Sequence, residues 1–145
     1  MWIFTSKGMV SCVRHRDVPS AILVRARSKD HLLEFVGPEL ADRYFHLQNC
    51  DYQHRAVIQE LAFKQRLLQH ADAIQYPDFK GSIPKEQKFT AYHQACHGVW
   101  AIMNDFGHGR YDFDTTVTYA NPNEDVSPDD AFDKFYGDMI GSESE

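Results

Sequence analysis

The feature that most constrains the fold is a strand–turn–strand pattern near the amino terminus. Residues 9–14 alternate between apolar and polar side chains, and residues 21–27 contain β-branched side chains in an apolar run. Both patterns are typical of strands. Residues 16–20 include aspartate, proline and serine, which favour a turn because proline fixes φ and the other two bond to nearby backbone. These segments together predict a β-hairpin.

Helical and extended patterns alternate through the rest of residues 1–105. The elements predicted after the hairpin are a helix capped by Ser28 over 29–36, strands over 44–47 and 52–58, and helices over 60–74 and 84–106. Pro84 suits the first turn of the last helix. The apolar residues predicted to face the core are Leu61, Leu68 and Ala71 in the first of these two helices, and Phe89, Tyr92, Cys96, Val99 and Met103 in the second. This order predicts an α+β domain: an antiparallel sheet of about four strands with helices packed on one face, nearest to a ferredoxin-like variant.

The charge of the chain is unevenly distributed. The net charge is −6, but residues 1–105 carry 13 Lys+Arg against 11 Asp+Glu, while residues 106–145 carry two bases against ten acids. The sequence therefore predicts a slightly basic domain over 1–105 and an acidic tail over 106–145. Within the tail, Ser127-Pro128-Asp129-Asp130 is a strong start signal for a short amphipathic helix. The apolar tail residues expected to bind a partner, or to dock on the chain's own domain, are Phe132, Phe135, Tyr136 and Met139.

Several classes of protein do not fit the sequence. There is no apolar run of about 18–20 residues that could span a bilayer, and the first residues do not resemble a signal peptide, so we expect a cytoplasmic protein that does not enter membranes. Cys12, Cys50 and Cys96 are far apart and form no CxxC pair, which favours reduced thiols over a zinc site. Since glycine-rich nucleotide-binding and nucleophile motifs are also missing, no cofactor and no metal are expected.

Basic and aromatic residues gather on the predicted sheet. Alternation places Arg25 and Arg27 on one face of their strand, and Arg55 shares a face with Asp51 in the strand over 52–58 and its approach, next to Tyr52. Arginine offers a planar fork of donors suited to phosphate oxygens, and aromatic rings can stack on bases. The alternative interpretation is a solvated sheet face whose arginines pair with nearby acids.

Two histidines, His93 and His97, are four residues apart on the last predicted helix and therefore share a face. This spacing can hold a metal, but an HxxxH pair without a third ligand is weak evidence for one. We favour local hydrogen bonding for His93 and a solvated position for His97. A nucleophile pair of Cys96 with His93 is weaker still, because Cys96 lies on the core stripe.

Several segments keep a fixed order and spacing: Met1-Trp2-Ile3-x-Thr5-x-x-Gly8-x-x-Ser11-x-Val13-x-His15-Arg16-Asp17, Leu23-Val24-Arg25-Ala26-Arg27, Asp51-Tyr52-x-x-Arg55-Ala56-Val57, Tyr76-x-x-Phe79-Lys80, and Tyr92-His93 with Trp100. In these segments, most of residues 1–104 resembles a group of small proteins of bacteria and their phages that has no established activity. The resemblance implies a small accessory protein, often from a mobile element, and it does not extend to the acidic tail. The residues that the hairpin and strand patterns or the resemblance single out for ligand binding are Arg16, Arg25, Arg27, Asp51, Tyr52, Arg55 and Lys80.

Three functions remain open on the sequence. The leading hypothesis is a binding protein for a nucleotide, nucleic acid or other phosphate-bearing ligand. The second is an inhibitor or adaptor of the host-takeover or anti-defence type, in which the acidic tail binds a host protein or covers the arginines of its own domain. The third, which we favour least, is a phosphodiester-acting enzyme with His93 as acid or base. The oligomeric state does not follow from the sequence.

Overall fold

The computed structural model describes residues 1–110 of the chain. The strands are β1 (Trp2–Thr5), β2 (Gly8–Arg14), β3 (Ala21–Ala26), β4 (Tyr44–His46) and β5 (His54–Gln59). The helices are α1 (Lys29–Val36), α2 (Glu60–Asp72), α3 (Phe79–Ser82) and α4 (Thr90–Gly107), with 3-10 turns η1 (Pro38–Arg43) and η2 (Gln87–Phe89). The predicted tail helix, with Phe132, Phe135, Tyr136 and Met139, lies outside the described residues.

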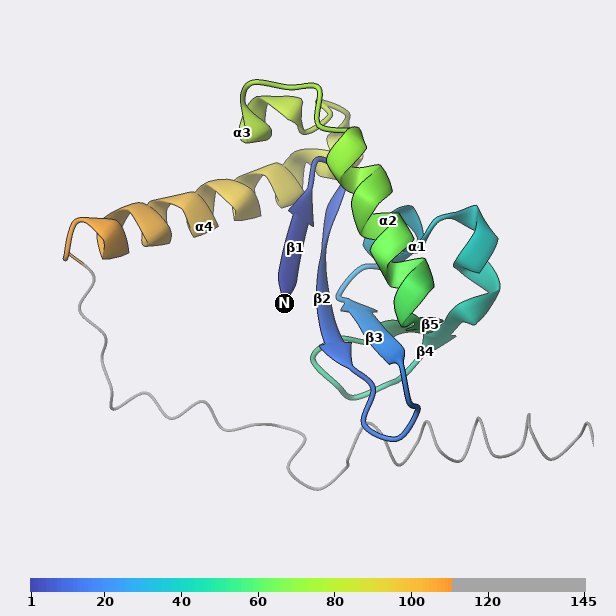
Figure 1. The fold of residues 1–145 in the computed structure, drawn as a ribbon. Coiled ribbons are helices and arrows are strands. Elements are labelled where there is room, and N and C mark those ends of the chain that lie inside the picture. Colours follow the sequence, from blue (N-terminus) through green and yellow to red (C-terminus); the bar gives the residue numbers. More distant parts are fainter. Residues whose placement is uncertain (111–145) are drawn as a thin grey trace, which may run out of the picture.

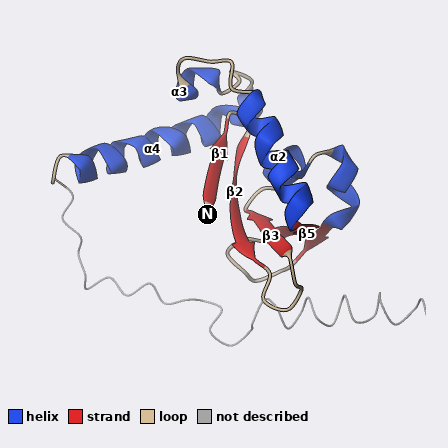
Figure 2. Cartoon of the chain, in the orientation of Figure 1, coloured by secondary structure: helices blue, strands red, loops and turns tan. Residues whose placement is uncertain are grey.

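The sheet has five strands in the order β1-β2-β3-β5-β4, and every neighbouring pair is antiparallel. Figure 2 draws the strands in red and the helices around them in blue. The α+β class and the antiparallel sheet are therefore confirmed, but the count of about four strands is wrong. The missed strand is β1, whose four residues are too short a run for alternation to identify. The first three strands are consecutive neighbours in the sheet, and this order does not confirm the ferredoxin-like arrangement.

One face of the sheet carries the main core. Val10, Val24 and Ile58 point to this face and pack against Phe35 of α1 and Phe63 of α2. Helix α1 begins and ends at the predicted residues, but the Ser28 side chain makes no capping hydrogen bond. Gly37 follows the last turn at φ +82°, a conformation that glycine adopts without steric cost.

The inward face of α2 was assigned wrongly. Leu61 and Leu68 are 68% and 62% exposed, and Ala71 is exposed as well. Phe63 is buried instead, and Leu67 packs against the same core. The apolar residues of α2 predict the wrong inward face because the helix has polar and charged side chains at the border of its buried side. There, the Nε of Arg66 donates to the carbonyl of Phe35 at 2.8 Å.

The opposite face of the sheet is also covered in part, so the prediction of helices on one face only is wrong. Phe4 and Met9, directly opposite each other on β1 and β2, pack against Ile83, Tyr92 and Cys96. These residues belong to α4 and the segment before it. The helix fills this site because its first two turns carry an aromatic ring and a thiol on one face.

Helix α4 begins at Thr90 rather than at Pro84. Five residues lie between the two, and they include η2. Only Tyr92 and Cys96 of the predicted stripe within α4 are buried, whereas Val99 and Met103 are 41% and 58% exposed. The reason is visible in Figure 1, where α4 runs past β1 and away from the sheet. Within residues 1–110, no helix is long and apolar enough to cross a membrane.

Candidate ligand-binding site

A single row of side chains crosses the second face of the sheet. The strand registers pair Trp2 with Ser11, Ser11 with Arg25, Arg25 with Arg55, and Arg55 with Phe45. Residues directly opposite in an antiparallel pair share a face, so these five side chains form one line over all five strands. The line places two arginines side by side at its centre.

Tyr52 joins these arginines to a third one. The Cζ atoms of Arg25 and Arg27 lie 4.9 Å and 4.3 Å from the centre of the Tyr52 ring, which is within the range of cation–π attraction. The Nε of Arg55 donates to the carbonyl of Tyr52 at 2.9 Å. Three guanidinium groups therefore converge on one residue. We call Arg25, Arg27, Arg55 and Tyr52 the arginine cluster.

The loop before β5 produces this convergence. The predicted strand over 52–58 begins two residues later, at His54, so Tyr52 is not held in the ladder and its carbonyl can turn back to Arg55. In the same loop, Asp51 receives hydrogen bonds from Arg27 in a fork, with Nη2 at 2.7 Å from each carboxylate oxygen. The sequence predicted the residues of the cluster, but it placed Arg27 and Tyr52 inside strands. The structure ends β3 at Ala26 and begins β5 at His54.

The members of the arginine cluster differ in exposure. Arg55 and Tyr52 are buried, at 3% and 7% exposed, and Arg25 is half-buried, with its Nη2 donating to the Oγ of Ser11 at 2.9 Å. Arg27 and Asp51 both have side chains that are 57% exposed. The cluster thus has an inner part fixed by backbone and hydroxyl contacts and an outer part that solvent or a ligand can reach.

The other predicted ligand-binding residues lie elsewhere. Arg16 is exposed in the turn between β2 and β3. Lys80 lies in α3, with its Nζ at 4.2 Å from the ring centre of Trp100 in α4. His93 lies in α4 with its ring at 4.6 Å from that of His97. The candidate acid or base therefore lies on α4, whereas the arginines lie on β3, the residue after it and β5.

The residues around His93 offer little chemistry beyond packing. No group of three or more His, Cys, Asp or Glu suited to a metal occurs within residues 1–110. Burial raises the pKa of the Cys96 thiol, which opposes formation of the thiolate that a nucleophile would need. Within residues 1–110, therefore, neither a metal cluster nor an activated Cys96 thiol accompanies His93.

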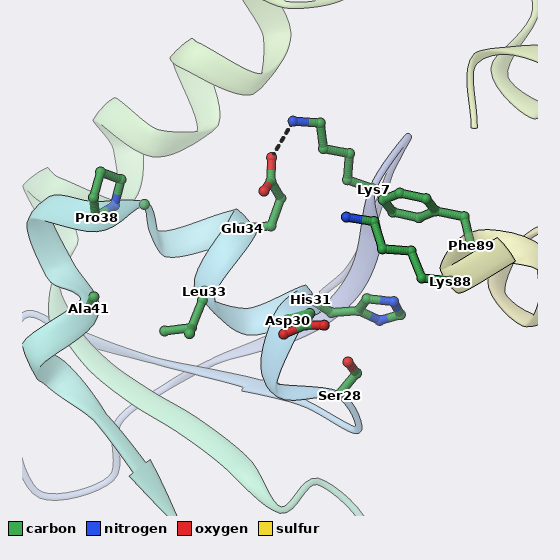
Figure 3. Close-up of a pocket in the computed structure, with 11 residues that line it drawn as sticks. Lys7, Ser28, Asp30, His31, Leu33, Glu34, Pro38, Ala41, Lys88 and Phe89 are labelled. Carbon is green, nitrogen blue, oxygen red and sulfur yellow. Dashed lines mark hydrogen bonds and ion pairs between the residues drawn. The ribbon is translucent and has the colours of Figure 1, made fainter. Parts of the chain in front are cut away.

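A cavity that the sequence did not suggest lies between α1 and the chain before α4. Its volume is about 550 Å³, and Figure 3 shows Lys7, Glu34 and Lys88 at its edge. Lys7 and Glu34 form an ion pair at 2.7 Å. Charges of both signs line the cavity, so it is suited to small polar molecules in general and does not select one class.

His31 is the polar residue held most firmly in this cavity. Its Nδ1 accepts from the backbone N–H of Met9 at 3.4 Å, and its ring meets Tyr92 edge-on at 4.9 Å. A Cβ on Gly8 would lie 2.6 Å from the ring, so glycine is needed for this approach. Burial lowers the pKa of His31. The contact joins residues 23 positions apart in the sequence, so no local pattern indicates it.

Comparisons of the chain with protein-family models, with curated protein sequences and with solved structures found no match. The geometry of the arginine cluster and of the cavity is therefore the basis on which a function can be argued.

Proposed function

We propose that this chain is a small binding protein that holds a nucleotide, a nucleic acid or another phosphate-bearing ligand at the arginine cluster. The observation that carries the proposal is the convergence of Arg25, Arg27 and Arg55 on Tyr52. Guanidinium groups bind phosphate through two parallel N–H donors, and several of them at one place favour a group with more than one anionic oxygen. The resemblance supports the role of a small accessory factor in a bacterium or in a phage-infected cell.

The geometry favours contact with phosphate over stacking on bases. Tyr52 is 7% exposed, and Arg25 and Arg27 lie over its ring, so its face is occupied by cations. A base could not reach this ring without displacing them. Tyr52 therefore acts as a support that orients two guanidinium groups, and the ligand would meet the arginines.

Arg27 and Asp51 form the accessible edge of the proposed site. Their forked ion pair is more than half exposed, and an exposed pair of this kind contributes only about 0–1 kcal/mol to stability. An incoming phosphate could take the place of the carboxylate at low cost. Asp51 would then act as an internal competitor that keeps weak anions out.

Binding of a fluorescently labelled single-stranded oligonucleotide of about 20 nucleotides tests the proposal. The full chain should raise its fluorescence anisotropy at low salt, and added salt should weaken the binding, because phosphate contacts release counterions. A labelled mononucleotide in a parallel titration separates recognition of a single phosphate group from recognition of a strand.

Arg27→Gln and Arg55→Met should each weaken the binding. Arg14→Gln is the matched control, because Arg14 is an exposed arginine of β2 that pairs with Glu60 at 3.3 Å, outside the cluster. If neither probe binds at low salt, or if the control variant weakens binding as much as the cluster variants do, the proposed function is wrong.

A further inference from the structure

The apolar face of α4 continues after the helix has left the sheet. Tyr92, Cys96, Val99, Met103 and Phe106 follow one another at spacings of four and three residues, which keeps them on one side of a helix. The first two are 8% and 5% exposed, whereas the last three are 41%, 58% and 59% exposed. The same face is thus core at one end and solvent-facing at the other. We call residues 99–106 the arm.

The edge strand of the sheet lies next to the arm. Strand β1 is the terminal strand and pairs only with β2 in the described part of the chain. Met1 and Cys12 exchange two backbone hydrogen bonds of 2.8 Å, so by alternation Ile3 and Thr5 also turn their backbone groups to β2. The N–H and C=O of Trp2 and Phe4 therefore point outward, where another strand could pair with them.

Nothing in β1 guards this edge. Its residues Trp2–Thr5 include no charged side chain and no proline, the devices that commonly prevent an edge strand from pairing with another chain. Met1 and Trp2 are also 68% and 66% exposed. Trp2 and Phe4 lie on the same face because they are two residues apart, and Phe4 packs in the cluster of Tyr92. The exposed Trp2 ring is therefore on the side of the sheet that α4 covers.

We propose that a second copy of this chain binds here, with the two β1 strands antiparallel and each arm lying on the sheet of the other copy. The Tyr92 hydroxyl donates to the carbonyl of Thr5 at 2.7 Å, so α4 crosses β1 at its Thr5 end. An antiparallel β1 of a second copy brings its Trp2 to that end, on the same face. The arm of one copy then meets the Trp2 ring of the other.

The reach of the arm fits this arrangement. Residues 99–106 extend about 12 Å at about 1.5 Å per residue, and neighbouring strands are about 4.8 Å apart. The arm can therefore cover β1 and β2 of the second copy, and it ends before Arg25 of the arginine cluster on β3. A shorter helix would stop at the edge, and its last apolar residues would have no sheet beneath them.

The surface is complementary to itself, which argues for a second copy over a different protein. One patch supplies the strand edge, the Trp2 ring and the apolar arm, and a two-fold axis uses each of them twice in a closed pair. Helix α4 carries one charged side chain, Asp105, among its 18 residues, so two arms approach each other's sheets without like-charge repulsion. This inference does not depend on the proposed ligand.

Analytical ultracentrifugation of the full chain gives the first test. We expect twice the chain mass of 16.8 kDa at about 200 µM, since a modest interface gives micromolar affinity. Trp2→Glu and Met103→Glu should each return the protein to 16.8 kDa with no change in its circular dichroism. Leu61→Glu, at an apolar position of α2 that is 68% exposed, is the matched control and should remain dimeric.

Disulfide trapping tests the arrangement itself. A Trp2→Cys protein mixed with a Met103→Cys protein and oxidised should give a species of doubled mass in which residue 2 of one chain is linked to residue 103 of the other. A monomer at about 200 µM, a dimer without this link, or a control variant as disruptive as Met103→Glu would each overturn the inference. If the chain is monomeric but the amides of the arm are protected from hydrogen exchange, the proposed dimer is wrong and residues 111–145 of the same chain cover the arm.

Discussion

Arg25 on β3 and Arg55 on β5 lie directly opposite each other in the sheet, and Arg55 is only 3% exposed. Like charges at directly opposite positions destabilise an antiparallel pair, and burial adds the loss of hydration. The ligand site that we propose would give these two arginines a role on this face beyond packing.

Arg55→Met should separate stability from binding. The change removes the hydrogen bond from Nε to the carbonyl of Tyr52, which costs about 1 kcal/mol, and relieves the repulsion with Arg25. We expect the free energy of unfolding in urea to change by less than about 1.5 kcal/mol. Oligonucleotide affinity should fall at least about tenfold, which corresponds to about 1.4 kcal/mol. Affinity equal to that of the wild type would show that Arg55 serves the fold alone.

Asp51→Asn should strengthen binding. The substitution removes the carboxylate whose two oxygens each accept from the Nη2 of Arg27 at 2.7 Å. It leaves a neutral side chain of the same size. Because the pair is exposed, the loss of stability should be about 1 kcal/mol or less. We expect affinity for the labelled oligonucleotide to rise about three- to tenfold at low salt, and less in high salt. Glu60→Gln, which releases Arg14, should leave affinity unchanged; weaker binding by Asp51→Asn would exclude the competitor role.

The sequence was sufficient where the signal is local. The hairpin of β2 and β3, the helix α1 with its glycine end, and the face shared by Arg25 and Arg27 all follow from alternation and turn chemistry between near neighbours. Strand β1 is not predicted from the sequence because Ile3 packs against one core cluster and Phe4 against another. A strand that packs apolar side chains on both faces shows no alternation over so short a length.

Other features depend on contacts that no local pattern contains. The stripe of α4 has helical spacing throughout, and only the position of the sheet edge decides that Cys96 is buried and Met103 exposed. Tyr52 belongs to the arginine cluster because its loop turns back before β5. His31 lies against Gly8 because β2 passes beside α1. In each case the decisive partner is distant in sequence or is the edge of an element.

The stability of the protein should fall below pH 6.5 partly because of His31. Burial lowers the pKa of this side chain from its ordinary value of 6.5. Between this value and the lower pKa of the folded state, His31 is more protonated in the unfolded chain than in the folded chain. The stability that neutral His31 contributes is fully present above pH 6.5 and is lost as the pH falls through the lower pKa of His31 in the folded state. Urea unfolding at about pH 7.5 and about pH 5.5 should therefore show a smaller loss for His31→Phe than for the wild type. Equal losses would mean that His31 is not the titrating group; Leu33→Ala, in the same helix, is a control without a titrating side chain.

Tyr92→Phe should loosen the anchor of α4. The hydroxyl donates to the carbonyl of Thr5 at 2.7 Å, and burial raises the pKa of the phenol, so the group remains a donor over the ordinary pH range. Loss of this bond removes one donor from the carbonyl of Thr5 and should reduce the free energy of unfolding by about 1 kcal/mol. Amide hydrogen exchange should become faster in the first turns of α4. Tyr76→Phe is the matched change, and it should have little effect because Tyr76 lies in the loop before α3. If exchange in α4 is unchanged in Tyr92→Phe, apolar packing with Ile83 and Phe4 alone holds the helix on the sheet, and the direction of the arm depends on that packing.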